Sequence, residues 1–102
     1  MTIEHYKKAD TLHIKLCGEL DEHHSAYVRT TIDMLTDGDT FKRVYIDMSD
    51  LDFMDSTGIG VLIGRYKRLK PRGIPIFIQS PRPTVDKVLK LSGIYEIMTK
   101  AG

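Results

Sequence analysis

Residues 51–60 read Leu-Asp-Phe-Met-Asp-Ser-Thr-Gly-Ile-Gly, and they lie where a strand gives way to a helix. Before this segment, Val44, Ile46 and Met48 alternate with other residues, which is typical of a strand buried on at least one face. After it, apolar residues recur on one face of a helix from Ser56 to about Leu69. This order predicts one β-α unit of a crossover α/β sheet.

Strands and helices also alternate on both sides of this unit. Thr11–Cys17 has the alternation of a half-buried strand that ends at Gly18, and Ile3–Lys7 is expected to pair with it. Asp21 is a good N-cap for a helix that continues to about Leu35. The remaining expected elements are a strand at Ile74–Ile78, a short helix with Val85, Val88 and Leu89 that ends at Gly93, and a last short strand at Ile94–Met98. The whole pattern predicts an α/β fold with a single mixed sheet of about four to five strands, formed by an opening hairpin and then β-α crossovers, and covered by about three to four helices.

Length and composition predict one small soluble domain over residues 1–102, with 41% hydrophobic residues. The sequence has 15 Lys and Arg residues and 14 Asp and Glu residues, which gives a net charge of +1. A charge this small produces no overall electrostatic attraction for nucleic acid or anionic lipid. No apolar run approaches the roughly 20 residues that cross a membrane, and no signal peptide opens the sequence. Cys17 is the only cysteine, which excludes an internal disulfide. We therefore expect a cytoplasmic protein without membrane or nucleic-acid partners.

The start of the predicted helix carries two hydroxyl side chains. Asp55 suits the N-cap position, which leaves Ser56 and Thr57 in the first turn beside unpaired backbone N–H groups. A helix N-terminus tolerates an anion well, so a phosphoryl group on Ser56 would not unfold the helix. Gly58 and Gly60 reduce helix propensity but remove side-chain bulk, so we expect them to let another protein approach the hydroxyls.

A phosphoryl group on Ser56 would act on a docked partner. It adds about −1.5 to −2 charges beside Asp55 and, where the strand ends converge, beside Asp21. If binding weakens by about 3 kcal/mol, affinity falls more than a hundredfold, which is enough for a switch. Because hydroxyls are common at helix N-termini, the alternative is that Ser56 and Thr57 only cap the helix.

Three separated motifs give the sequence a family resemblance that spans about Leu12 to Met98. Residues 53–61, followed by Gly-Arg-Tyr-Lys at 64–67, resemble the phosphorylation segment of bacterial anti-anti-sigma factors, which are STAS-domain proteins. The resemblance continues at 18–21, Gly-Glu-Leu-Asp, with a histidine pair at 23–24, and at 92–94, Ser-Gly-Ile. It favours the sporulation type over the general stress-response type.

The resemblance implies a switching mechanism. In this family the dephosphorylated protein binds an anti-sigma factor that is also a serine kinase, and so frees the sigma factor. The kinase uses ATP to phosphorylate the serine that matches Ser56, the complex dissociates, and a serine phosphatase restores the binder. The protein is then a substrate and not an enzyme, needs no cofactor, and is expected to be a monomer when free. Thr57 is a minor alternative phosphorylation site.

The same resemblance implies a set of partner contacts. Asp21 matches the acidic residue that ends the family's Gly-Glu-Leu-Asp motif, and it is expected to lie near the phosphorylation site and contact the kinase. The other expected partner-binding residues lie in or beside the matching helix: Asp55, Thr57, Gly58, Ile59 and Arg65. Many relatives continue into another helix after their last strand, whereas this sequence ends at Gly102.

Two other functions fit parts of the pattern. A STAS module that senses a small ligand or forms part of a scaffold would retain a metabolite and would not be a kinase substrate. A small hydrolase or phosphatase using Ser56 is disfavoured, because Met-Asp-Ser-Thr-Gly at 54–58 differs from the Gly-x-Ser-x-Gly of a nucleophile elbow.

Metal and nucleic-acid sites are also disfavoured. Four aspartates crowd the region before the helix, at Asp47, Asp50, Asp52 and Asp55, but a magnesium pocket needs further groups, and solvated loop acids are the simpler interpretation. His23 and His24 are adjacent, so on a helix they cannot share one metal ion. The basic run between Arg65 and Arg72 is expected to form a solvated helix face. No metal site is predicted.

Overall fold

A five-stranded mixed sheet forms the centre of the computed structural model, which describes residues 1–102. The strands lie side by side in chain order, β1-β2-β3-β4-β5. β1 is antiparallel to β2, which confirms the opening hairpin, and every later pair is parallel. The strands are β1 (Thr2–Lys8), β2 (Thr11–Leu20), β3 (Arg43–Met54), β4 (Ile76–Gln79) and β5 (Thr99–Lys100).

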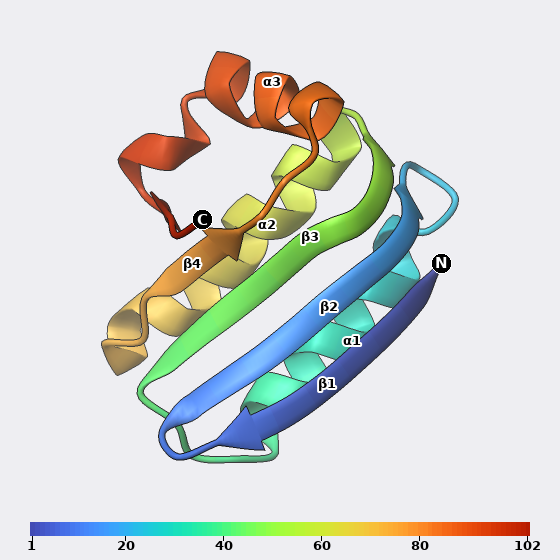
Figure 1. Cartoon of the computed structure of the whole chain (residues 1–102). Coiled ribbons are helices and arrows are strands. Elements are labelled where there is room, and N and C mark those ends of the chain that lie inside the picture. The colour runs from blue at the N-terminus through green and yellow to red at the C-terminus, as the bar shows by residue number, and fades with distance from the viewer.

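Three α-helices connect the parallel strands, so the predicted fold class is confirmed. They are α1 (Ser25–Asp37) between β2 and β3, α2 (Ser56–Leu69) between β3 and β4, and α3 (Pro83–Ser92) between β4 and β5. Because each new strand is added at the same side of the sheet, right-handed crossovers place successive helices on the same face. Figure 1 shows α1 and α2 behind the sheet and α3 across one end of it. No helix is both long and apolar enough to span a bilayer.

The core lies between the sheet and the helices. Alternate residues of β2 and β3, such as Ile14 and Ile46, point toward α1 and α2 and are fully buried. They meet the apolar stripes of the helices, represented by Ile32 on α1 and Leu62 on α2. These side chains belong to one continuous cluster of 23 buried hydrophobic residues, so a single core supports all three helices.

The opposite face of the sheet has no helix over it (Figure 1). Its middle row is aromatic: His13, Tyr45 and Phe77 lie on neighbouring strands, with ring centroids 5.5 and 4.9 Å apart. Tyr6 on β1 stacks on His13 at 4.5 Å. Cross-strand ring contacts of this kind stabilise a sheet face that is open to solvent.

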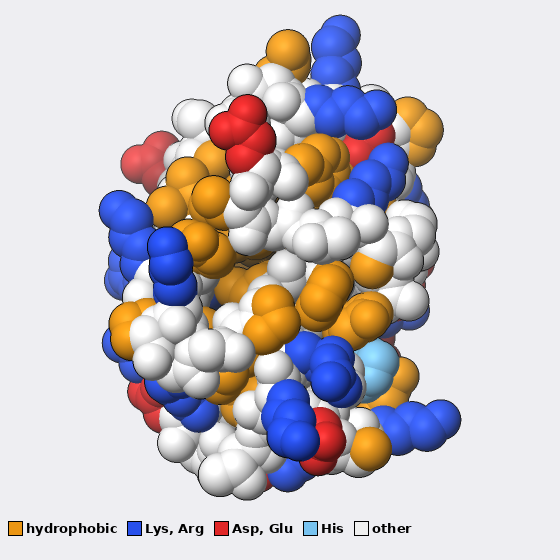
Figure 2. All heavy atoms as spheres, turned by 90° about the vertical axis from the view of Figure 1, so that its left-hand side faces the viewer, with side chains coloured by type: hydrophobic (Ala, Val, Ile, Leu, Met, Phe, Trp, Pro, Cys, Tyr) orange, Lys and Arg blue, Asp and Glu red, His pale blue; other side chains and the backbone are white.

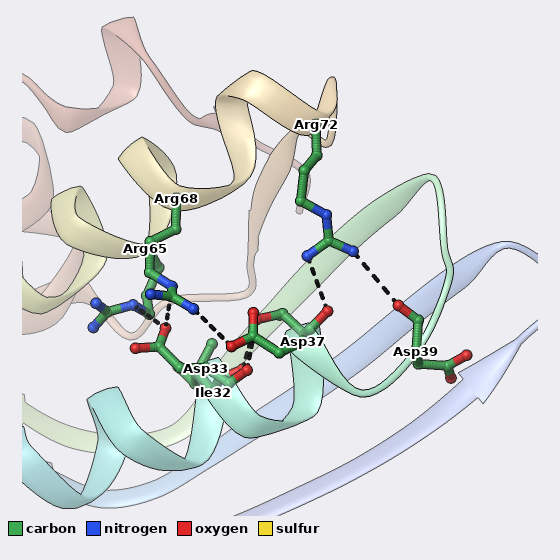
Figure 3. A network of polar contacts seen from close by, with 8 residues as sticks. Ile32, Asp33, Asp37, Asp39, Arg65, Arg68 and Arg72 are labelled. Carbon is green, nitrogen blue, oxygen red and sulfur yellow. Dashed lines mark hydrogen bonds and ion pairs between the residues drawn. The ribbon is translucent and has the colours of Figure 1, made fainter.

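Arginines of the basic run tie α2 to α1 (Figure 3). Arg65 Nε lies 2.7 Å and Arg68 Nε 3.1 Å from Asp33 Oδ1, and Arg72 Nη1 donates to the Thr36 carbonyl at 3.0 Å. The predicted solvated face is therefore wrong for Arg65, whose side chain is only 7% exposed against Asp33. Arg68 and Arg72 are exposed, as predicted, although each also contacts α1. Figure 2 shows the side of the molecule that is on the left in Figure 1, where Lys and Arg side chains are scattered among hydrophobic ones.

Two strands run further than the sequence pattern predicts. The alternation ends at Met48, but β3 continues to Met54, and β2 continues past Gly18 to Leu20. Register shifts between the two strands break the period-two pattern, so Leu51 stays buried although it is out of phase with Met48. Sequence alternation cannot reveal a strand whose bulges are set by pairing with a neighbour.

The expected last strand at Ile94–Met98 is wrong. Ile94–Glu96 forms a short 3-10 helix, and the strand consists only of Thr99–Lys100. Gly93 has φ +77°, which ends α3 as predicted and reverses the chain. The Met98 N–H then donates to the Ile94 carbonyl at 2.9 Å, so Ile94 and Met98 are buried on the same side of a turn. Spacing of four residues, and not alternation, explains the apolar pair.

A polar cluster around Asp86 of α3 holds the C-terminal segment in place. The Tyr95 hydroxyl donates to Asp86 Oδ1 at 2.6 Å, and the ammonium groups of Lys90 and Lys100 lie 3.1 and 3.2 Å from the same carboxylate. These contacts lower the pKa of Asp86 from 3.8 to about 2. The hydrogen bond from Tyr95 is the largest cause, and the two lysines add to it. Burial and the Asp86 contact raise the pKa of Tyr95.

The lowered pKa of Asp86 predicts a pH dependence of folding. A carboxyl with a depressed folded-state pKa stabilises the fold above its unfolded value and loses that contribution as pH falls through its folded value. We expect about 1–2 kcal/mol to be lost between about pH 4 and pH 2. Urea unfolding across this range should show a smaller loss for Tyr95→Phe, which keeps the ring but removes the hydroxyl. Equal losses for the two proteins would contradict this assignment.

Candidate functional site

The carboxyl ends of β2 and β3 leave the sheet side by side. Leu20 pairs with Met54 in the last register position of these parallel strands. Asp21 and Asp55 are the next residues in each chain, so the two predicted acidic residues stand at the same end of the sheet. The strand order thus brings together the motif at 18–21 and the segment at 51–60. In parallel sheets this end is where binding residues gather.

Asp55 caps α2, as predicted. Its Oδ1 accepts from the backbone N–H of Thr57 at 2.9 Å and from that of Gly58 at 3.3 Å. The backbone of Asp55 is extended, with φ −117°, which is typical of an N-cap. Because the capping acceptor is the Asp55 carboxylate, the cap does not use the hydroxyl of Ser56. Ser56 is exposed at the first position of the helix, and Thr57 is half-buried.

Gly58 has a different role from the one predicted. We expected it to give a partner access to the hydroxyls, but it is buried against the strand ends. A Cβ at this position would lie 2.7 Å from Met54 Cγ and 3.1 Å from the Leu20 carbonyl oxygen. The absence of a side chain therefore lets the first turn of α2 sit directly on β2 and β3. Gly60, in contrast, has open space around its missing Cβ, so the original expectation of access applies there.

Asp21 is not the N-cap of α1, which corrects the sequence prediction. The helix begins at Ser25, and its N-cap is His24. Asp21 Oδ1 instead accepts from the His24 backbone N–H at 3.1 Å and contacts the ring Nδ1 at 2.9 Å, so it closes a separate turn before the helix. Partial burial opposes ionisation, but the hydrogen bonds and the nearby His24 ring outweigh it and lower the pKa of Asp21. The residue is a partly exposed anion at this end of the sheet.

Ile59 and Arg65 do not line the exposed surface around Ser56. Ile59 belongs to the core cluster. The Arg65 side chain is only 7% exposed and faces Asp33 of α1. Both residues support the packing of α2. Of the residues predicted to contact a partner, Asp21, Asp55 and Thr57 remain at least partly accessible beside Ser56.

Sequence reasoning missed Phe53, whose residue surface is 46% exposed. Phe53 pairs with Glu19 of β2, and both are exposed. The sequence signal was a large aromatic residue between two aspartates, Asp52 and Asp55, which is unusual for a core strand. Strict alternation along β3 does not predict the exposure of Phe53, because the register shifts between β2 and β3 decide which face of the sheet this residue occupies.

The four aspartates considered as a magnesium pocket have other partners. Asp50 pairs with Lys15 at 2.9 Å, Asp52 pairs with Arg82, and Asp55 caps α2. Asp47 accepts from the Ser49 backbone N–H at 2.8 Å. No group of three or more His, Cys, Asp or Glu side chains is placed to hold a metal ion. The local chemistry is thus an exposed hydroxyl at a helix N-terminus with acidic neighbours.

Comparison with known proteins matches the chain over nearly its whole length. A family model described as STAS domain covers residues 2–101. The anti-sigma F factor antagonist of Paenibacillus polymyxa is 34% identical over 96 residues, which is 94% of this chain and 80% of the relative. Among solved structures, the anti-sigma factor antagonist SpoIIAA in its unphosphorylated form aligns with a TM-score of 0.83 and 29% identity, over 99% of this chain and 89% of that chain. The Bacillus cell fate determinant SpoIIAA in the phosphorylated form aligns with a TM-score of 0.72 and 29% identity, over 99% and 92% of the two chains.

The two glycines of the first turns of α2 provide a matched pair of variants. Gly58→Ala forces a methyl group against Met54 and the Leu20 backbone, and we expect it to lower the free energy of unfolding by about 1–3 kcal/mol. Gly60→Ala adds the same methyl group in open space and should raise it by up to about 1 kcal/mol through better helix propensity. Urea unfolding of both variants measures the difference. Equal effects would contradict the close packing assigned to Gly58.

Proposed function

Because the chain belongs to the STAS-domain family and to its anti-sigma factor antagonists, we propose that Ser56 is the phosphorylation switch that controls its binding to an anti-sigma factor. The dephosphorylated form binds an anti-sigma factor that has serine kinase activity, and the sigma factor is released. Transfer of a phosphoryl group to Ser56 ends the complex. A serine phosphatase restores the binding form. The protein itself is a monomer when free.

The exposed Ser56 hydroxyl is the observation that carries this proposal. It lies at the first residue of α2, where the Asp55 carboxylate already caps the helix, so no structural contact of the cap is lost when the hydroxyl is modified. A phosphate there lies at the positive end of the helix dipole, which stabilises an anion. Thr57 is half-buried, which favours Ser56 as the acceptor. The phosphorylated form of SpoIIAA, a relative of the same fold, supports the same interpretation.

The acidic surroundings of Ser56 explain why phosphorylation would release the partner. Asp21 and Asp55 stand at the same strand ends, and two further acidic residues are exposed nearby, Glu19 in β2 and Glu22 in the segment that follows it. A partner that docks here must present basic or neutral groups. A phosphate adds about −1.5 to −2 charges and a bulky group in the middle of that surface. The added repulsion and the lost contact weaken the complex with the partner, while the fold of the free protein is retained.

The chain acts as the substrate in this cycle and supplies no catalytic group. The Ser56 oxygen forms a bond to the γ-phosphorus of ATP, the bond between that phosphorus and the bridging oxygen of ADP breaks, and a base on the kinase takes the hydroxyl proton. The phosphatase later hydrolyses the serine phosphate with water. Since ATP and the transcription machinery are the partners of this cycle, we place the protein in the cytoplasm.

Charge at Ser56 is tested by three variants with the anti-sigma factor kinase encoded in the same genome. Ser56→Ala should bind as tightly as the unmodified protein and persist when ATP is present. Ser56→Asp should bind at least tenfold more weakly, because a charge replaces a neutral group beside Asp55, and a tenfold change is about 1.4 kcal/mol. Ser56→Asn has nearly the size of aspartate without its charge and should bind within a few fold of the parent.

Isothermal titration or surface plasmon resonance without ATP gives these affinities. Peptide mass mapping after incubation with the kinase and ATP should find one phosphate, on Ser56. The proposal fails if Ser56→Asp binds like Ser56→Asn, or if the phosphate is found elsewhere.

A further inference from the structure

An apolar groove lies at the end of β3, the strand that leads into Ser56. Phe53, three positions before Ser56 in the sequence, forms one side of it. The groove has a volume of about 330 Å³ and is lined by Asp52, Phe53, Met54, Thr84 and Val88. These residues come from the end of β3 and the first turns of α3. We call this feature the Phe53 groove.

Contacts between β3 and α3 link the two walls of the groove. Arg82, which precedes α3, donates from Nε to the Ser49 carbonyl at 2.8 Å and pairs with Asp52. Val85 and Leu89 fix the other side of α3 in the core, where both are fully buried. Because β3 and α3 are already linked, an occupant does not have to bring the two walls together.

Exposure alone does not distinguish Phe53 from other surface residues. Leu91 on α3 is 80% exposed and Met34 on α1 is 70% exposed, and isolated apolar residues of this kind are normal on protein surfaces. Phe53 differs because it borders a groove and belongs to the same strand end as Asp55 and Ser56. A large aromatic residue beside a pre-formed groove is the usual setting of a binding hot spot.

The rim of the groove indicates the kind of segment that can occupy it. Glu19 is the cross-strand neighbour of Phe53, and Asp21 and Asp55 follow at the strand ends. Two cations border the α3 side of the groove: Arg82, which is paired with Asp52, and Lys87, which is exposed one turn after Thr84. On the side of β2 and β3, the accessible rim next to Phe53 is acidic, while the groove walls are mostly apolar. An apolar side chain flanked by basic residues complements both features.

We infer that the anti-sigma factor inserts an apolar side chain from a basic segment into the Phe53 groove when it docks over Ser56. This inference rests on the proposed function, because it names the contact that the partner of that site makes. The groove supplies a steady apolar anchor, and Ser56 supplies the charge that is switched. Release on phosphorylation then requires the repulsion to raise the dissociation constant above the concentration of the partner, although the apolar contact in the groove remains.

The anchor is tested by removing Phe53 and by filling the groove. Phe53→Ala should raise the dissociation constant for the anti-sigma factor kinase of the same genome, measured without ATP, by about thirtyfold, as truncation of a hot spot does. Thr84→Phe leaves Phe53 in place but occupies the groove and should weaken binding by at least tenfold. Leu91→Ala and Thr30→Phe make the same kinds of change at exposed positions outside the groove and should bind like the parent. Circular dichroism and urea unfolding identify any variant that is not folded.

Each outcome distinguishes the groove from the proposed function. Weak binding by Phe53→Ala and Thr84→Phe, with normal binding by both controls, supports the inference. If Ser56→Asp binds weakly while Phe53→Ala and Thr84→Phe bind like the parent, the switch stands and the groove is overturned. If the unmodified protein does not bind the anti-sigma factor at all, the proposed function itself is overturned.

Discussion

The side-by-side exit of β2 and β3 from the sheet is the constraint on which the rest of the site depends. Leu20 and Met54 form the last pair of these strands, and the first turn of α2 packs directly on them because Gly58 has no side chain. This packing fixes where Asp55 caps the helix and where Ser56 meets solvent. It also places Asp21, from a distant part of the chain, at the same end. A shift of one residue in the register would move these groups to different faces of the sheet.

Different residues near this strand end hold the fold and carry the proposed switch. Asp55 and Gly58 fix the helix start, and the Arg65–Asp33 ion pair holds α2 against α1. Ser56 takes no part in those contacts, so the proposed phosphorylation would leave them in place. The neighbouring Phe53 groove offers apolar contact that does not depend on the charge of Ser56. A switch built in this way changes affinity while the free protein stays folded.

Local signals in the sequence predict much of this structure. The apolar spacing from Ser56 to Leu69 and the capping role of Asp55 both follow from residues within a few positions of one another, and both are confirmed. Contacts between distant segments account for the rest. The turn closed by Asp21 depends on the conformation of the loop before α1. Arg65 is buried because its partner, Asp33, comes from α1. Phe53 is exposed because of a register shift between β3 and β2. The packing role of Gly58 also depends on a distant segment, because the atoms that leave no room for a side chain there include those of Leu20 in β2.

The most direct test of the central claim compares the phosphorylated and unphosphorylated proteins in binding to the anti-sigma factor over a range of salt concentrations. Repulsion between a phosphate and a docked partner is screened by salt, since the Debye length falls from about 10 Å at 0.1 M to about 3 Å at 1 M. The account predicts that phosphorylation weakens binding strongly at low salt and that the difference narrows as salt rises. Equal affinities of the two forms at low salt would contradict it, and so would a difference that salt leaves unchanged.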